Sequence, residues 1–285
     1  MNHIIQLQNS FRKAGYMKII ISHDVDHISA WEHSKDLIIP KFIARALIEW
    51  CFGYISTSEV KGRLLSVINN KWNQIEELME FDSSNSIPST FFIGVMNECY
   101  LAYRKDIASK WIEKIRLKGF DVGVHGIAYN SFNNMFEEYK TFKKISSLDT
   151  FGIRMHYLRT TDNTFQNLAR IGYVFDSSEK AMKNPYKIET MWEFPLHIMD
   201  GYIICRNQRW QNRKFKDIQH ITINYLENAQ RKGILYFTVL FHDRYFSDTF
   251  KTWKEWYIWF VTYCKELGMD FISYRDAILE LDNLM

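Results

Sequence analysis

The segment KIIISHDVDH, residues 18–27, begins as a run of apolar and β-branched residues and ends in two carboxylates two positions apart. A short apolar run of this kind predicts a buried strand. Asp24 and Asp26 follow the run directly, with His23 and His27 on the two sides of the pair. A carboxylate after a strand often caps the next helix, so Asp24 taken alone has two interpretations, a helix cap or a functional group. The residues at the ends of the other predicted strands decide between these two interpretations.

Strand-like runs recur along the chain and alternate with helix-like segments. We expect strands at 17–22, 90–95, 121–124, 152–157, 173–176, 192–198, 235–241 and 271–273. Apolar residues at three-to-four spacing predict helices at 38–52, 59–81, 104–118, 216–232 and 250–267, and a further helix from a cap at Thr161 or Asp162 to Ile171. Four of these helices are followed by a glycine, the residue typical of a left-handed C-terminal cap: Gly119, Gly172, Gly233 and Gly268.

Alternating strands and helices predict parallel strands joined by right-handed crossovers. Seven or eight such units in 285 residues indicate a distorted or incomplete (β/α)7-type barrel with outer helices. The first crossover is unusually long, which predicts a helical insertion at about 31–82. Residues 1–16 are expected to form an N-terminal extension and 17–285 a single barrel. An open doubly wound sheet is the alternative, weakened because no GxGxxG or GxxxxGK[ST] follows a strand.

Composition limits the function classes. The formal charge of +3, from 36 basic and 33 acidic residues, gives no indication of nucleic-acid binding. The four cysteines contain no CxxC pair and are expected to be reduced thiols, which suits a cytoplasmic protein. No run reaches the roughly 20 apolar residues of a membrane span, and residues 1–13 lack the apolar core of a signal peptide. We therefore expect a cytoplasmic location.

Titratable residues collect at the ends of the predicted strands, where parallel β/α folds carry their functional groups. Besides the first strand, these residues are His125, Arg154, His156, Asp176, Glu193, His197, Asp200, His242 and Asp243. Each has an ordinary structural interpretation: His197 as a satisfied core histidine, Asp176 as a turn residue, Glu193 as an ion-pair partner of an arginine. Together, however, two aspartates and three histidines on different strands indicate hydrolysis assisted by a divalent cation, because Asp and His hold zinc, cobalt, nickel or iron.

The order and spacing of these motifs resemble the polysaccharide deacetylases, carbohydrate esterase family four with its NodB-homology domain, over roughly residues 17–280. The matching stretches are ISHDVD (21–26), IPSTFFIGV (87–95), FDVGVHG (120–126), GIRMHYLR (152–159), GYVFDSS (172–178), WEFPLHIMD (192–200), VLFHD (239–243) and DFISYRDAI (270–278). The resemblance implies a (β/α)7-like barrel that removes the acetyl group of an N-acetylated sugar.

By this resemblance, Asp24 is the catalytic base, Asp26 and His125 bind the metal, His242 is the catalytic acid and Arg154 orients Asp24. The remaining site residues are implied to bind the sugar or to support the others: Glu193, Asp176, Tyr129, Tyr157 and Arg159. Trp192, Trp210 and Tyr245 are further candidates for a sugar platform. The implied cofactor is a divalent metal, zinc first, with cobalt or nickel as alternatives.

Three motifs depart from the family pattern. Val25 separates the usually adjacent aspartates, so an exchange of roles between Asp24 and Asp26 stays open. Tyr129 occupies the place of the usual second histidine, and Met155 and His156 follow Arg154 where proline and tyrosine are usual. We hypothesise that His156 supplies the missing nitrogen, with His27, His197 or Tyr129 next in line. This divergence resembles the WbmS-type branch associated with O-antigen and capsule biosynthesis.

Two rival functions follow from the same residues. The departures at Val25 and Tyr129 suit a glycan-binding homologue that has lost its metal and its activity. Alternatively, the barrel carries another metal-dependent hydrolase that acts on a phosphoester or a cyclic amide. Bound metal separates the first rival from an enzyme, and the identity of the product separates the second.

Overall fold

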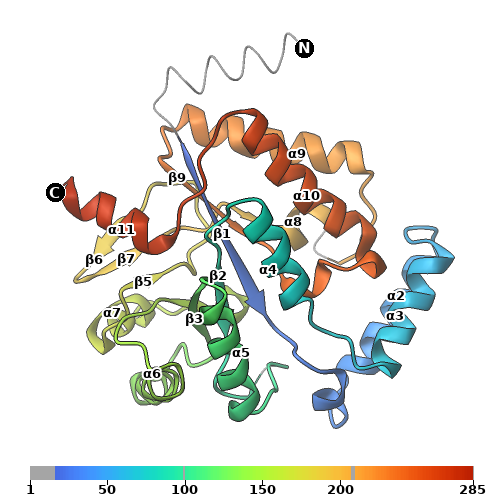
Figure 1. The fold of residues 1–285 in the computed structure, drawn as a ribbon, viewed down its shortest axis with the longest axis horizontal. Coiled ribbons are helices and arrows are strands. Elements are labelled where there is room, and N and C mark those ends of the chain that lie inside the picture. Colours follow the sequence, from blue (N-terminus) through green and yellow to red (C-terminus); the bar gives the residue numbers. More distant parts are fainter. Residues whose placement is uncertain (1–16, 99, 207–208, 285) are drawn as a thin grey trace.

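The computed structural model describes residues 17–98, 100–206 and 209–284, and its core is one nine-stranded sheet (Figure 1). The predicted extension 1–16 and Cys99 lie outside the described residues, whereas Cys51, Cys205 and Cys264 are free thiols. The strand order is β6-β7-β5-β4-β3-β2-β1-β9-β8, and all pairs are parallel except β6 with β7. The strands are β1 (Lys18–Val25), β2 (Thr90–Ile93), β3 (Asp121–Gly126), β4 (Ile153–Met155), β5 (Phe175–Asp176), β6 (Tyr186–Ile188), β7 (Met191–Glu193), β8 (Ile198–Met199) and β9 (Tyr236–Leu240).

The sheet curls because a single segment, residues 191–199, supplies one strand near one end of the strand order and another at the opposite end. In residues 191–199, β7 pairs with β5 and β8 pairs with β9. The Phe194 amide donates to the Asp176 carbonyl at 2.8 Å, and the His197 amide donates to the Thr238 carbonyl at 3.2 Å. Pro195 lies between these amides and cannot donate to either neighbour. The distorted (β/α) barrel predicted from the sequence is confirmed, and residues 191–199 form its irregular, interrupted strand.

Helices surround the sheet (Figure 1). They are α2 (Ile38–Cys51), α3 (Thr57–Ile68), α4 (Ile75–Ser84), α5 (Lys105–Leu117), α6 (Phe132–Ser146), α7 (Thr164–Ile171), α8 (Asp200–Ile204), α9 (Phe215–Arg231), α10 (Lys251–Glu266) and α11 (Tyr274–Asn283). Short 3-10 turns are η1 (Ala30–His33), η2 (His156–Leu158), η3 (Asp243–Tyr245) and η4 (Asp248–Phe250). All four predicted glycine stops are confirmed, since each adopts a positive φ.

The long first crossover differs from its prediction in one respect. A single helix was expected over 59–81, but the chain breaks between α3 and α4. Asn70 has a φ of 55°, in the left-handed region that asparagine tolerates, and its side chain accepts hydrogen bonds from Ser29 Oγ and the Ala30 amide at 2.8 and 2.7 Å. The apolar periodicity runs through this break, so the spacing alone could not reveal it. As a result α4 packs on the barrel, while α2 and α3 stand at its side (Figure 1).

The alternation of side chains along β1 decides what faces the barrel interior. Ile20 belongs to an aromatic cluster with Phe92, Phe175 and Tyr274, in which α11 covers the amino-terminal end of the barrel. Ser22 and Asp24 continue the same face toward the carboxyl end. His23 faces the other way, toward α4 and α10. The first strand therefore delivers its carboxylates to the end of the barrel where parallel β/α folds place their sites.

Candidate active site

A cleft of about 460 Å³ lies at the carboxyl ends of the strands. Its volume falls within the range usual for small-molecule sites. Its polar walls come from strand ends far apart in the sequence: Asp24, Asp26, His125, His156, Asp200 and His242. The structure therefore gathers the two aspartates and the three predicted histidines around one space.

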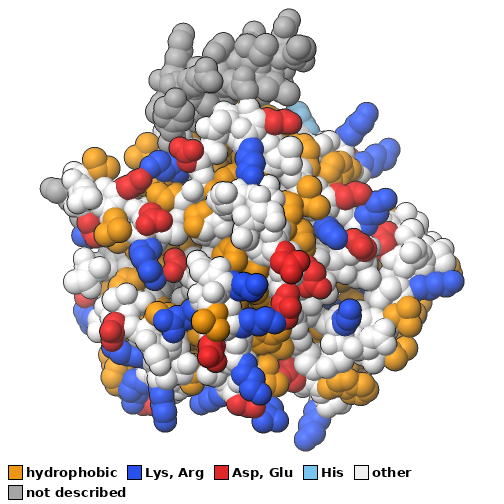
Figure 2. Space-filling view, in the orientation of Figure 1, with side chains coloured by type: hydrophobic (Ala, Val, Ile, Leu, Met, Phe, Trp, Pro, Cys, Tyr) orange, Lys and Arg blue, Asp and Glu red, His pale blue; other side chains and the backbone are white. Residues whose placement is uncertain are grey.

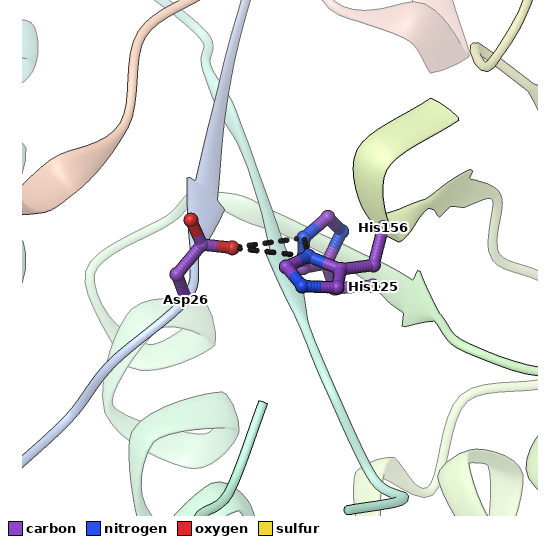
Figure 3. A group of neighbouring side chains, drawn as sticks. All are labelled: Asp26, His125 and His156. Carbon is purple, nitrogen blue, oxygen red and sulfur yellow. Dashed lines mark hydrogen bonds and ion pairs between the residues drawn. The ribbon is translucent and has the colours of Figure 1, made fainter. Parts of the chain in front are cut away.

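Asp26, His125 and His156 form the tightest group in the cleft (Figure 3). The Asp26 Oδ1 atom lies 3.1 Å from His125 Nε2 and 3.3 Å from His156 Nδ1, and these two nitrogens are 2.9 Å apart. The three residues come from the loop after β1, from β3 and from η2 directly after β4. Three parallel strands, β1, β3 and β4, thus bring one donor atom each to a common point, although β2 lies between β1 and β3.

This donor set fits a divalent cation. One carboxylate and two imidazoles are a usual ligand set for zinc, and a tetrahedral ion with bonds of about 2.0–2.1 Å separates its ligands by roughly 3.3–3.4 Å. His125 Nδ1 lies 3.2 Å from the Arg154 carbonyl oxygen, which can only accept, so the ring proton is held there and Nε2 keeps its lone pair. Acceptor atoms facing one another at these separations repel unless a proton or a cation lies between them. The group is therefore built as a candidate metal centre.

The charge of Asp26 agrees with such a centre. Burial alone works against the carboxylate, but the His125 and His156 rings, when protonated, donate to Asp26, and together with the charge of His242 they hold the pKa of Asp26 well below its usual range. Asp26 thus presents an ionised oxygen at neutral pH, the form that binds a cation.

Asp24 is held differently, by a buried arginine. Its exposed fraction is 3%, and Arg154 Nη1 donates to its Oδ1 at 3.1 Å. The rest of the guanidinium is fixed by the Ser22 hydroxyl at 2.7 Å, the Ser177 carbonyl at 3.0 Å and the Tyr274 hydroxyl at 2.8 Å. Arg154 has no freedom to turn away, so Asp24 stays oriented with its Oδ2 atom 3.9 Å from His125 Nδ1.

His242 faces the candidate metal centre from the opposite wall of the cleft. Its Nδ1 lies 2.9 Å from Asp200 Oδ1, and its amide donates to Asp200 Oδ2 at 2.8 Å. The Nε2 atom is thereby turned into the cleft, 3.7 Å from Asp26 Oδ2. Burial opposes the charge of the ring, but Asp200 outweighs it and raises the pKa of His242 to about 10. His242 therefore carries a proton at neutral pH.

Asp176 and Glu193 lie away from the cleft. They are fully buried partners in the β5–β7 register, and their contacts are to Ser178 and the Glu179 amide. Burial, reinforced by Asp176, raises the pKa of Glu193 well above its usual range. Neither residue can touch a sugar in the cleft. Of the two roles expected for them, binding the sugar and supporting the other site residues, only the second is compatible with their positions. Glu193 also makes no bond to Arg154, the partner suggested by the sequence, in the described part of the chain.

The three other predicted site residues divide between the cleft and its rim. Tyr157 lines the cleft, with a φ of 57° and its ring 4.0 Å from that of His156. Arg159 donates to the His156 and Ile127 carbonyls at 3.3 and 3.4 Å and lies over the Tyr129 ring. Arg159 and Tyr129 are not among the residues lining the cleft. Arg159 therefore braces the loops that carry His125 and His156.

Several residues singled out from the sequence are structural. His23 bonds to the Phe241 carbonyl and to Asp82 at 2.9 and 2.8 Å inside the core. His197 bonds to Thr238 and to the Lys183 carbonyl, as its structural interpretation required, so it is not a spare ligand. Trp192 is buried against α11, with its indole donating to Asp282, which rules it out as a sugar platform.

Two features of the site were missed. Asp200 was noted at a strand end, but its pairing with His242 depends on β8 lying beside β9, which the sequence does not reveal. His27 lines the cleft and is the first member of a hydrogen-bonded relay, His27–His33–Asp36. His27 Nδ1 lies 2.9 Å from His33 Nε2, and His33 Nδ1 lies 2.8 Å from Asp36. The signal for this relay was the HxxxxxHxxD spacing of residues 27–36.

No protein-family model and no curated protein matches the chain. Solved structures do: one assigned to the polysaccharide deacetylases from Mycobacterium smegmatis has a TM-score of 0.61 at 12% identity, covering 94% of this chain and 90% of its own. Another so assigned, from Pseudomonas aeruginosa PAO1, has a TM-score of 0.60 at 10% identity, covering 94% and 91%. PuuE allantoinase has a TM-score of 0.57 at 10% identity, covering 91% and 87%. The chain therefore has the fold of the polysaccharide deacetylases, as its motifs predicted.

Proposed function

We propose that the protein is a metal-dependent deacetylase that hydrolyses the N-acetyl group of a sugar in surface-polysaccharide biosynthesis. The observation that carries the proposal is the single cleft in which an Asp–His–His group lies between an arginine-held aspartate and an aspartate-held histidine. The sequence motifs resembling the deacetylases supply the substrate class, and the WbmS-type resemblance supplies the pathway class.

Each side chain has a role set by its contacts. Asp26, His125 and His156 would hold zinc, which supplies Lewis acidity and lowers the pKa of a bound water. Asp24, fixed by Arg154, would accept the proton of the attacking water at Oδ2. His242, protonated and held by Asp200, would give its Nε2 proton to the leaving amine. Tyr157 and Tyr245, both at the wall of the cleft, would contact the sugar.

Acetate release from N-acetylated oligosaccharides by the zinc-loaded protein tests the proposal. We expect Asp24→Asn to lower the rate by roughly 100-fold or more while zinc stays bound, because the substitution removes the base and keeps the side-chain shape. Asp217→Asn, an exposed change on α9, is the matched control. An Asp24→Asn variant that releases acetate at the wild-type rate would show that Asp24 is not the base.

The same assay separates the rival functions. A protein that holds no zinc, cobalt or nickel and releases nothing would be a glycan-binding homologue. Ring-opened product from a cyclic amide, or phosphate from a phosphoester, without acetate from any N-acetyl sugar would identify another barrel hydrolase. A cyclic amide is included among the test substrates because PuuE allantoinase shares the fold.

A further inference from the structure

A second cavity of about 170 Å³ adjoins the cleft, between the helical insertion and the barrel. The two spaces share His27, Ile38, Arg45 and Tyr245 as lining residues, so they are continuous. The insertion contributes residues of α2 and α3, and the barrel contributes residues of η3 and η4 after β9. A substrate whose sugar occupies the cleft can therefore extend a substituent into this cavity.

The cavity is lined by four cations: Lys41, Arg45, Arg63 and Arg244. Two carboxylates accompany them, since Glu49 accepts from Arg45 at 3.0 Å and from Arg63 at 2.7 Å, and Glu59 lies near Arg63. The lining thus carries about two positive charges more than negative ones.

Arg244 is the cation whose charge is least compensated. Its guanidinium lies over the Trp72 and Phe42 rings at 4.0 and 4.3 Å, and its buried Nη2 has no hydrogen-bond partner among the described residues. Burial, with a contribution from Arg63, lowers the pKa of Arg244 to about 10. The neighbouring Asp243 offsets only part of this charge, since burial raises its pKa to about 7. A buried donor without an acceptor is costly, and an anionic ligand would satisfy it.

We propose that this cavity binds a phosphate or diphosphate group attached to the sugar, so that the substrate is a glycosyl phosphate. The inference rests on the proposed deacetylase function of the adjoining cleft. A dianionic group matches the surplus of charge, and the guanidinium groups of Arg244 and Arg45 can donate to phosphate oxygens, whereas Arg63 already donates to Glu49, Gln211 and the Thr249 carbonyl. The phosphate would come from a nucleotide-linked or a lipid-linked sugar, which present the same chemistry to the cavity.

Calorimetric titration with inorganic pyrophosphate at fixed ionic strength tests the cavity without any catalysis. We expect Arg244→Gln and Arg45→Gln each to weaken binding by about 10-fold or more, since each loses a charged hydrogen bond to the ligand. Lys61→Gln removes one exposed charge of α3 outside the cavity and should bind like the wild type. Circular dichroism checks that both arginine variants fold. Absent binding, or equal binding in all four proteins, would overturn the proposal.

Kinetics with three substrates identify the source of the phosphate. UDP-N-acetylglucosamine, a polyprenyl diphosphate-linked N-acetylglucosamine and neutral N-acetylated chitotetraose are compared for acetate release. We expect a lower KM for a phosphorylated substrate, and we expect Arg244→Gln to raise that KM by a larger factor than the KM of the neutral substrate, whereas Lys61→Gln should change neither. Equal kcat/KM for all three substrates would overturn the proposal. Pyrophosphate binding that Arg244→Gln abolishes, without acetate from any substrate, would sink the deacetylase function and leave the phosphate cavity standing.

A separate observation concerns the α2–α3 hairpin, residues 38–68. Of the 17 large hydrophobic side chains exposed in the described part of the chain, nine lie in residues 31–68. Five of them surround the turn of the hairpin: Leu47, Ile48, Trp50, Phe52 and Tyr54. Hydrophobic side chains are visible in Figure 2 on the right of the molecule, where Figure 1 places α2 and α3. Such a concentration marks an interaction surface.

The exposed charges of residues 31–71 are all positive, and Lys61 on α3 is the one nearest in sequence to the turn between α2 and α3. Between residues 31 and 71 the exposed charged residues are Lys35, Lys41, Lys61 and Lys71, whereas the carboxylates Glu32, Asp36, Glu49 and Glu59 are buried or half-buried. A hairpin whose turn is apolar and whose exposed charges are all lysines is complementary to a lipid membrane with an apolar interior and an anionic surface. We infer that the hairpin turn docks on an anionic lipid membrane.

Co-sedimentation with vesicles tests the docking. We expect the protein to bind phosphatidylglycerol vesicles, to bind phosphatidylcholine vesicles weakly and to dissociate as salt rises. The double variant Leu47→Ser/Phe52→Ser should lose about 10-fold or more in affinity. Leu117→Ser, which changes an exposed leucine on α5, is the matched control. No binding by the wild type, or equal binding by the double variant, would overturn the inference.

Discussion

At the residue scale, Asp24 and Asp26 differ because Asp24 lies within β1 and Asp26 follows it. Asp24 is inside the barrel and meets Arg154. Asp26 stands beyond the last paired residue, is 24% exposed and reaches His125 and His156. Val25, which separates the pair, is the residue whose side chain points into the core between them. The proposed division into base and ligand follows from these surroundings.

His242 gives a prediction about pH. Its ordinary pKa is 6.5 and the folded value is about 10, with burial opposing and Asp200 outweighing it. The charged pair stabilises the fold fully below pH 6.5, and this contribution is lost as pH rises toward 10. A cation at Asp26 lowers the absolute pKa of His242, but the part due to Asp200 remains. Asp200→Asn should therefore move the alkaline limb of kcat to lower pH.

The measurement is the pH profile of kcat and of KM from pH 5 to 10, with Asp217→Asn as control. We expect the Asp200→Asn variant to lose roughly 100-fold at pH 8 and less at pH 5.5, where the ring is protonated without help. A uniform loss at every pH would mean that Asp200 acts only on the shape of the site.

At the element scale, the short strand β4 carries Arg154 and presents His156, and its position depends on a glycine that precedes it. A Cβ on Gly152 would lie 2.2–2.4 Å from three atoms of the Phe175 ring. Overpacking of this kind costs about 1–3 kcal/mol. Gly152→Ala should therefore lower the melting temperature by several degrees. Gly201→Ala, where a Cβ meets nothing within 4 Å, should leave it nearly unchanged. Equal melting temperatures for the two variants would contradict this packing argument.

The same elements show what the sequence can and cannot predict. Buried strands such as Lys18–Val25 were readable because their apolar runs end abruptly, and the helix stops were readable because Gly119 and Gly233 need a positive φ. The break at Asn70 could not be predicted, because it leaves the apolar periodicity intact. The hairpin β6–β7 could not be predicted either, because its strands have only three residues each. In the site, residues at strand ends were foreseeable. The pairing of Asp200 with His242 was not, because it requires knowing how residues 191–199 close the barrel.

At the scale of the whole molecule, the candidate metal centre joins distant parts of the chain. Asp26 follows β1, His125 lies at the end of β3 and His156 follows β4. No helix in the described segments is long and apolar enough to span a membrane. Helix α2 connects the cleft, the cationic cavity and the apolar turn, because Ile38 and Arg45 line both the cleft and the cavity and Trp50 lies near the turn. The long first crossover thus gives the barrel a second binding region.

Zinc should stabilise the fold as a whole, because the unfolded chain cannot hold ligands from residues 26, 125 and 156 together. At a free zinc concentration 100 times Kd, one site contributes about 2.7 kcal/mol to the free energy of unfolding. Thermal melts with zinc and with a chelator should then differ by several degrees in the wild type and in His220→Ala, which changes an exposed histidine on α9. In His156→Ala most of this difference should vanish, because only two ligands remain. If His156→Ala keeps the full zinc-dependent shift, the third ligand is not His156, and the relay end at His27, on the wall of the same cleft, becomes the residue to replace next.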